Sequence, residues 1–229
     1  MQGITPNTTV SEQAFQVLRQ DVLSGRHAPE TKLKLDTLQS LYGYSSSPLR
    51  EALNRLVQEG LVKADERRGF RVAAISPDDL ADITKMRLLL DVTALRESIQ
   101  HGDDAWEANI VASFHRLEKI ESRLPLGPVV LDAEWSQRHR DFHMSLIAAC
   151  PSERQLSWSI SLFDQAERYR HFAARNRTVL KKKDAEHRAL MKAVVRRDAA
   201  TASQMLSEHI AGTQTNVLAA FALMPKNRT

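Results

Sequence analysis

The sequence predicts a mainly α-helical protein in two parts, a small domain at residues 1–75 and a larger all-helical domain at residues 76–229. Apolar residues recur at three- and four-residue spacing along most of the chain, which is typical of amphipathic helices. Gly and Pro interrupt this pattern at intervals that suit helices of ordinary length. One short stretch, residues 61–72, instead alternates in the manner of two strands joined by a turn.

The composition indicates a cytoplasmic protein without a membrane partner. The chain has 229 residues, 26% of them charged, and its net charge of +4 permits a nucleic-acid partner without requiring one. Its single cysteine, Cys150, cannot form an internal disulfide and suits a reducing compartment. No signal peptide is evident, and no apolar run approaches the ~18 residues that a membrane span needs.

Three short helices are expected in the first domain. The first follows Ser11, which can cap it, and the second covers about 35–42 before Gly43 breaks it. The third begins at Ser45–Ser47, which offer an N-cap, and Pro48 suits its first helical position. Two short helices joined by a glycine-containing turn form a helix-turn-helix pattern.

The third helix offers a polar face that suits the major groove of DNA. Apolar residues hold its inner side, while short hydroxyls and an arginine occupy its start and its outer side. Such side chains reach base edges when a helix enters the groove. Taken alone, the segment is also compatible with an ordinary amphipathic helix in solvent. The candidate DNA-binding residues of this helix are Ser45, Ser46, Ser47, Arg50 and Asn54.

The strand pair that follows predicts a basic wing. Residues 61–64 and 70–72 would pair across a hairpin turn. Arg67 and Arg68, next to Gly69, lie at its tip and suit phosphate contact or insertion into a minor groove. Alternatively the turn is simply solvated, because the two acids that precede the arginines can neutralise their charge. Three helices plus a two-stranded wing make a winged helix-turn-helix.

These parts together resemble the winged-helix domain of GntR-family bacterial transcription regulators over residues 10–73. The stretches SSSPLREALNRLVQEGLV and RRGFRV carry the likeness. Two positions depart from the family pattern: Ser46 stands where Arg is frequent, and Asp36 where some members have a basic residue. The resemblance implies a DNA-binding domain. The operator contacts that it implies are Ser45, Ser47, Arg50, Arg67, Arg68 and Gly69.

From the Ser76-Pro77 boundary onward, nearly every segment predicts a helix. Ser76 can cap the first helix, Pro77 suits its first position, and two acids follow in the first turn. Successive helices of this length form an antiparallel bundle. The expected helices cover about 77–101, 103–120, 132–150, 152–175 and 178–196, with a last one from 198.

Four of the eight histidines are expected to converge inside this bundle. His139 and His143 are four apart and therefore share one helix face. His187 and His209 each lie ~15 to 17 Å along a helix from the turn between them, so an antiparallel hairpin brings them level. Converging imidazoles suit a divalent metal such as zinc or nickel, although single histidines are also common as packed or capping residues. The remaining histidines, expected at the surface or in loops, are His27, His101, His115 and His171.

Residues 78–220 resemble the FCD effector domain of the FadR subfamily of GntR regulators. The stretches MRLLLD, HRDFHMSLIAAC, DAEHRALMKAVVRRDAATASQM and SEHI carry the likeness, while GDDAWEAN and RHRDFH are most similar to CsiR-type repressors. The resemblance implies an effector-binding and dimerisation domain with a metal held by His143, His187 and His209. His139 stands where Asp or Asn is common, which makes either a four-histidine site or an effector contact. The long-chain acyl-binding branch typically lacks these histidines, so an acyl-CoA effector is not expected.

The expected function is transcription regulation, by a homodimeric repressor on a palindromic double-stranded operator. Two half-sites multiply the limited specificity of one small module. A small carboxylate is the expected effector, since an open metal position draws an anionic oxygen. Further anion contacts would come from arginines, unless these form a solvated or salt-bridged face, as Asp91 four residues after Arg87 allows. The candidate effector-binding residues are Arg87, Arg168, Tyr169 and Arg170.

Two competing interpretations remain, a metal-dependent enzyme and a regulator with a purely structural metal. Glu186 is next to His187 and suggests a general base, but neighbours on a helix point about 100° apart. No His-Glu-x-x-His or other hydrolase motif occurs in the sequence. We therefore expect no enzymatic activity.

Overall fold

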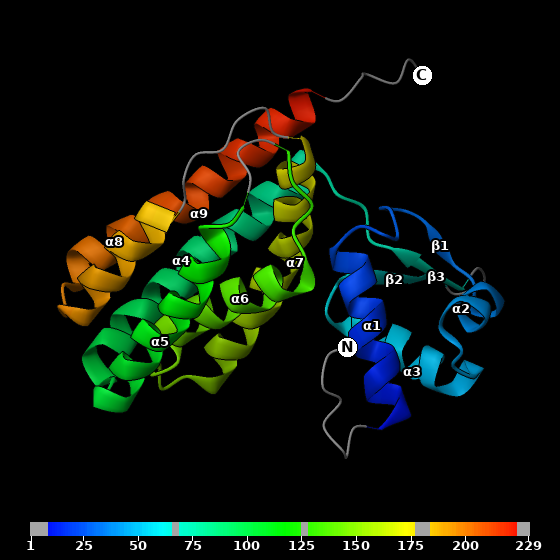
Figure 1. Cartoon of the computed structure of the whole chain (residues 1–229), viewed down its shortest axis with the longest axis horizontal. Coiled ribbons are helices and arrows are strands. Elements are labelled where there is room, and N and C mark those ends of the chain that lie inside the picture. The colour runs from blue at the N-terminus through cyan, green and yellow to red at the C-terminus, as the bar shows by residue number, and fades with distance from the viewer. Residues whose placement is uncertain (1–8, 66–68, 125–127, 177–183, 224–229) are drawn as a thin grey trace. The chain divides into compact units, whose positions relative to one another are not determined.

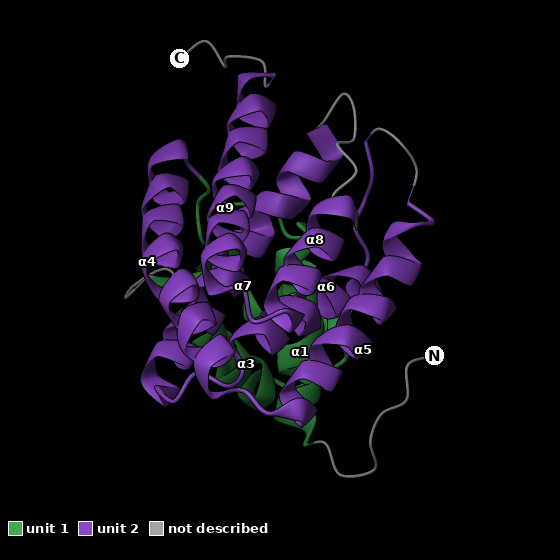
Figure 2. Ribbon diagram, turned by 90° about the vertical axis from the view of Figure 1, so that its left-hand side faces the viewer, with its two compact units in different colours: residues 1–75 green, residues 76–229 purple. Residues whose placement is uncertain are grey.

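The computed structural model describes residues 9–65, 69–124, 128–176 and 184–223. The chain divides into two compact units, residues 1–75 and 76–229 (Figure 2). The described residues form nine helices and one three-stranded sheet, which confirms the mainly helical fold class. No helix in these ranges combines the length and the apolar character that a membrane span requires.

The first unit packs three helices around one apolar core (Figure 1). They are α1 (Val10–Leu23), α2 (Leu35–Tyr42) and α3 (Ser46–Gln58), and both α1 and α2 pack on α3. Burying one large aliphatic side chain contributes about 1.5–3 kcal/mol, so this core fixes α3 firmly while its polar side stays exposed. The leucines at the centre of the core are Leu18, Leu49, Leu53 and Leu56.

An antiparallel sheet accompanies these helices, with its strands in the order β1-β3-β2. β2 (Val62–Asp65) and β3 (Gly69–Val72) form the hairpin that the sequence predicts. β1 (Lys32–Leu33) was not expected and pairs with the other side of β3. Two residues are too few to show an alternating pattern. Pairing with β3 creates this strand. Just before β1, the carbonyl of Thr31 accepts a hydrogen bond from Val72 N–H of β3 at 3.0 Å.

The starts of two helices differ from the sequence-based expectation. Ser45 is the N-cap of α3 but its side chain makes no capping hydrogen bond, and Pro48 is the third helical residue rather than the first. The side chain of Thr9, not of Ser11, caps α1. The Ser11 hydroxyl instead donates to Glu51 of α3 at 2.5 Å. The three serines at the start of α3, Ser45–Ser47, are exposed.

The second unit is a helical bundle whose boundaries follow local capping signals. The side chains of Ser76, Asp103, Asp132 and Asp198 each accept a backbone N–H in the first turn of a helix. Side-chain caps of this kind supply partners for otherwise unpaired N–H groups. The helices are α4 (Pro77–His101), α5 (Asp104–Glu121), α6 (Ala133–Ile147), α7 (Glu153–Asn176), α8 (Asp184–Val195) and α9 (Ala199–Ala222).

The bundle surrounds one apolar core that receives side chains from all of its helices. α4 packs against α6, α7 and α9, while α5 packs against α6 and α8 (Figure 1). α8 and α9 also pack on each other as an antiparallel hairpin. Segments far apart in the sequence therefore share one interior.

A buried tyrosine links the start of α4 to α7. Tyr169 is fully buried, and its hydroxyl donates to Asp79 at 2.5 Å while accepting from Ser76 N–H at 3.1 Å. Burial, and then the hydrogen bond to Asp79, raise the pKa of Tyr169, so its hydroxyl keeps the proton that it donates. This contact anchors the first residue of the second unit.

We expect Tyr169→Phe to lower the free energy of unfolding of the second unit by about 1.5–3 kcal/mol, because it removes a hydrogen bond to a carboxylate. Urea unfolding followed by circular dichroism measures the change. Tyr44→Phe makes the same chemical change at a partly buried side chain of the first core and should have little effect. Equal stability of wild type and Tyr169→Phe would contradict the anchoring role.

Candidate metal centre and nucleic-acid interface

The four histidines that the sequence singles out lie together in the interior of the second unit. His139 and His143 come from α6, His187 from α8 and His209 from α9. One ring nitrogen of each lies within 4.8 Å of those of the other three. All four side chains are buried, between 0% and 9% exposed. We refer to these four residues as the histidine cluster.

The spacing of the rings suits a tetrahedral metal ion. With metal–nitrogen distances of about 2.0–2.1 Å, imidazoles around one ion have their ring centres about 5.2 Å apart. The ring centres lie 4.5 Å apart for His139 and His143, 5.3 Å for His143 and His187, and 4.8 Å for His187 and His209. Donor sets made of imidazole nitrogen favour zinc, nickel and copper over magnesium or calcium. The residues present therefore fit a borderline divalent metal.

Two carboxylates contact the histidine cluster from outside. Glu121, the last residue of α5, places an oxygen 3.1 Å from Nδ1 of His187. Glu186 on α8 places an oxygen 3.3 Å from Nδ1 of His209. Nε2 of His187 is buried without a hydrogen-bond partner among the described residues. A buried lone pair of this kind needs a partner, and a metal ion supplies one.

His139 lies among aromatic rings in the buried cluster. Its ring stacks on Trp135 at 4.5 Å, with 13° between the planes, and lies 5.5 Å from the ring of Phe163. Burial, and then the neighbouring His143, lower the pKa of His139 well below 6.5. The ring is therefore neutral at neutral pH, as a metal ligand must be.

Two buried arginines lie next to the cluster. The guanidinium carbons of Arg87 and Arg170 lie 5.1 and 4.1 Å from the ring centre of Phe163. That ring is 5.3 Å from a ring of the cluster. Each arginine has a carboxylate partner, Asp91 at 2.9 Å and Glu167 at 2.6 Å. Positive charge is thus available beside the cluster, but it is already paired.

The structure separates the other two candidate effector residues from this pair. Tyr169 is bonded to Asp79 and Ser76 as described above, and the guanidinium of Arg168 lies 5.9 Å from the Tyr169 ring. Residues two apart on a helix point to nearly opposite sides, so Arg168 and Arg170 do not share a face. Of the four candidates, Arg87 and Arg170 are brought together.

One histidine expected at the surface or in a loop, His171, is found in the interior, so this expectation was wrong for it. His171 is 1% exposed, and its Nε2 lies 2.9 Å from the Ser136 hydroxyl and 3.4 Å from Glu167. His27 lies in the loop between α1 and β1, as expected, and is partly buried, with Nε2 2.7 Å from the Tyr42 hydroxyl. Helical spacing shows which residues share a face but not which faces another segment covers. The two that are exposed, as expected, are His101 and His115.

The candidate DNA-binding residues of α3 form one exposed face. Ser46, Arg50 and Asn54 follow at intervals of four and therefore align along the helix. All three are exposed, as are Ser45 and Ser47.

The opposite flank of α3 is fixed to α1 by charged contacts. Arg55 lies over the ring of Phe15 at 3.6 Å and pairs with Glu12 at 2.6 Å. Arg19 pairs with Glu59 at 2.9 Å. These contacts assign Arg55 to holding α3 rather than to its exposed face.

The wing is described in part. Gly69 begins β3 with a φ of +86°, a left-handed conformation that favours glycine. Arg67 and Arg68 lie outside the described residues, so their predicted contacts stay predictions.

Family profiles match both units of the chain. The FCD domain matches residues 82–212, and the bacterial regulatory proteins of the gntR family match residues 10–72. The chain is 39% identical to the HTH-type transcriptional regulator BphR of Paraburkholderia xenovorans, over 87% of this chain and 81% of BphR. It is 37% identical to the HTH-type transcriptional repressor GlaR of Escherichia coli, over 89% of this chain and 93% of GlaR.

Solved structures show the same fold. The structure of E. coli McbR/YncC has a TM-score of 0.75 at 19% identity, covering 94% of this chain and 99% of that one. A GntR transcriptional regulator from Rhodococcus sp. RHA1 has a TM-score of 0.71 at 16% identity, covering 92% and 98%.

We expect the stabilising effect of Glu167 to disappear in acid. Burial alone would raise the pKa of Glu167, but Arg170 and then His171 outweigh it and hold this pKa at about 2, against 4.5 ordinarily. The contribution of Glu167 to the free energy of unfolding is complete above pH 4.5 and is lost as the pH falls towards 2. The reason is that this carboxylate takes up its proton at higher pH in the unfolded chain than in the folded one.

Urea unfolding at a series of pH values measures this effect. The difference in unfolding free energy between wild type and Glu167→Gln should shrink with falling pH. Glu134→Gln, at a carboxylate that is 62% exposed, is the control. A difference between wild type and Glu167→Gln that stays constant would contradict the prediction.

Proposed function

The chain belongs to the gntR family of bacterial regulatory proteins and carries an FCD domain, and from this premise we propose that it is a metal-dependent repressor responding to a small carboxylate. The observation that carries the proposal is the buried histidine cluster within the FCD unit. The relatives named above are transcriptional regulators, and GlaR is named a repressor. These names favour a regulator over an enzyme.

In this proposal, α3 enters the major groove of an operator. The guanidinium of Arg50 suits bidentate contact with a guanine edge, while Asn54 suits an adenine edge. The hydroxyls of Ser45–Ser47 suit bases or nearby phosphates. Arg67 and Arg68 of the wing would contact the backbone or a minor groove.

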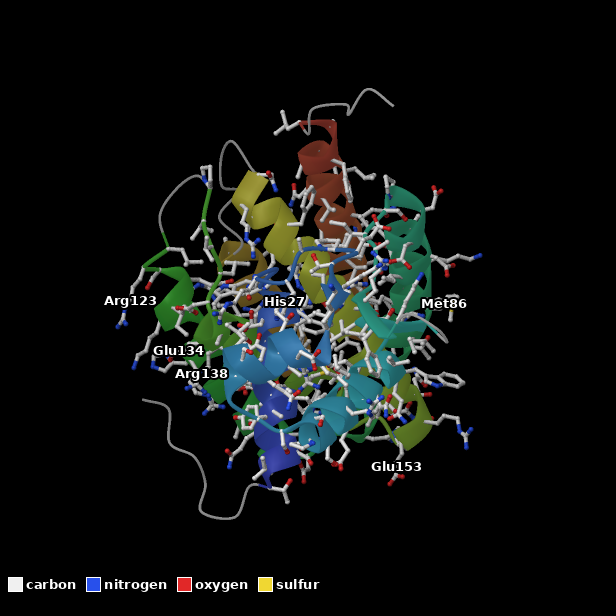
Figure 3. All side chains as sticks on the ribbon, turned by 90° about the vertical axis from the view of Figure 1, so that its right-hand side faces the viewer. His27, Met86, Arg123, Glu134, Arg138 and Glu153 are labelled. Atoms are coloured by element: carbon white, nitrogen blue, oxygen red, sulfur yellow. The ribbon has the colours of Figure 1, made fainter. Side chains whose placement is uncertain are left out.

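We further propose a homodimer on a palindromic operator, since regulators of this family generally dimerise. Met86 and Leu89 on α4 are 37% and 57% exposed, and Trp158 on α7 is 54% exposed. The two helices pack together, and Gln155 of α7 donates to the carbonyl of Leu90 of α4. Figure 3 shows Met86 at the edge of the ribbon, pointing away from it. A second copy that covers these exposed apolar side chains would remove them from water.

The histidine cluster is proposed to hold zinc or nickel. When bound, such a metal supplies a Lewis-acidic position that attracts an anionic oxygen. The chain keeps His139 neutral through burial and surrounds the cluster with the rings of Trp135, Phe142 and Phe163. These apolar rings restrict water, which strengthens electrostatic contacts in the site.

Arg87 and Arg170 are the stronger candidates for holding a carboxylate effector. Both are buried beside the cluster, whereas Tyr169 is already engaged with Asp79 and Ser76. A small anion would share these guanidiniums with their present carboxylate partners. Binding changes DNA affinity only if the DNA-competent state and the other state differ in effector affinity.

We expect protein purified without chelator to carry about one zinc or nickel per chain, held by ligands from three helices. His143→Ala and His187→Ala should each lose it, since each removes a nitrogen donor. Elemental analysis measures the metal, and His115→Ala at an exposed position is the control.

Full metal content in both cluster variants would contradict the proposed centre. Citrate added to metal-loaded protein separates a sensor from a structural metal. A shift in the visible spectrum of nickel-loaded protein indicates an open position, and its absence indicates a structural site.

We expect Arg50→Ala to weaken binding to the selected operator by about 1–3 kcal/mol, because it removes a base contact. The DNA is a duplex enriched from a random library by the wild-type protein, and fluorescence anisotropy at fixed salt gives the affinity. Arg154→Ala, at an exposed arginine of α7, should bind as wild type does. Unchanged operator affinity in Arg50→Ala would contradict the assigned groove contact.

A further inference from the structure

Two carboxylates outside the histidine cluster contact it directly. Glu121 and Glu186 each lie at hydrogen-bond distance from Nδ1 of a cluster histidine, 3.1 Å to His187 and 3.3 Å to His209. Neither sequence spacing nor the resemblance singled out Glu121. The sequence suggests a role for Glu186 only as a neighbour of His187, yet its carboxylate contacts His209 on another helix.

A carboxylate in this position acts on the far nitrogen of the ring. When Nδ1–H donates to the carboxylate, Nε2 carries the lone pair, and the ring is held in one orientation. In His187 that Nε2 is buried without a hydrogen-bond partner among the described residues.

We propose that Glu121 and Glu186 are positioning residues that set the metal affinity of the histidine cluster, an inference that rests on the proposed metal site. Through Glu121 the helix α5, which contributes no histidine to the cluster, becomes part of the centre. The side chain of Glu121 is 8% exposed and that of Glu186 is 47% exposed. Water screens the second contact more than the first, so Glu121 has the larger effect.

A neighbouring ion pair distinguishes this role from general bracing of helices. Glu118, one turn before Glu121 on α5, pairs with Arg188, which follows His187 on α8. This pair joins the same two helices but does not involve the cluster. If Glu121 only braced α5 against α8, Glu118 would be its equivalent.

The test measures zinc affinity by competition with a chromophoric chelator, using the full-length chain. Glu121→Gln should weaken zinc binding about 10- to 100-fold, and Glu121→Ala should weaken it further, since glutamine still accepts from Nδ1–H. Glu186→Gln should have a smaller effect in the same direction. Glu118→Gln and Glu208→Gln are the matched controls and should bind zinc as wild type does; Glu208 is exposed and bonded to Gln204.

Thermal unfolding of the zinc-free variants separates positioning from folding. If Glu121 is a positioning residue, Glu121→Gln without zinc has the same stability as zinc-free wild type but binds zinc more weakly. Equal zinc affinity of wild type and Glu121→Gln would overturn the inference and leave the metal site standing. Equal weakening by Glu118→Gln would also overturn it, in favour of bracing. Wild-type protein that binds no zinc or nickel would overturn the proposed centre itself, and the inference with it.

Discussion

The burial of four imidazoles at one point of a helical bundle is the constraint on which the rest of the second unit depends. Polar rings inside an apolar core cost free energy unless their nitrogens find partners. Glu121 and Glu186 supply partners for Nδ1 of two rings, and aromatic side chains enclose the others. Nε2 of His187 is buried without a hydrogen-bond partner in the part of the chain that the structure describes, which suits a metal ligand. Packing that served stability alone would place leucines there.

The polar groups of α7 extend this arrangement. Glu167, Arg170 and His171 form a buried set beside the cluster, and Tyr169 on the same helix is bonded to the first residue of the second unit. Replacing a whole buried ion pair by apolar residues is often neutral or stabilising, so stability alone does not explain its presence here. One rigid helix thereby touches both the candidate effector site and the point where the second unit begins.

Sequence patterns predicted the helices well because the signals are local. Caps such as Asp103, Asp132 and Asp198 act within one turn, and periodic apolar residues mark the buried side of each helix. The errors arose where a distant segment intervened. β1 exists only because β3 lies beside it, and His171 is covered by α6, which supplies Ser136.

The sequence by itself determined the two-part helical organisation, the exposed polar face of α3 and the four histidines worth examining. Spacing along single helices, and one helical hairpin, carry that information. Only the tertiary structure decided that the four rings share one point, that Arg87 joins Arg170 while Arg168 does not, and that Glu121 reaches His187. Each depends on the register between helices far apart in the chain. That register is set by side-chain packing across the whole core and leaves no periodic trace in any one segment.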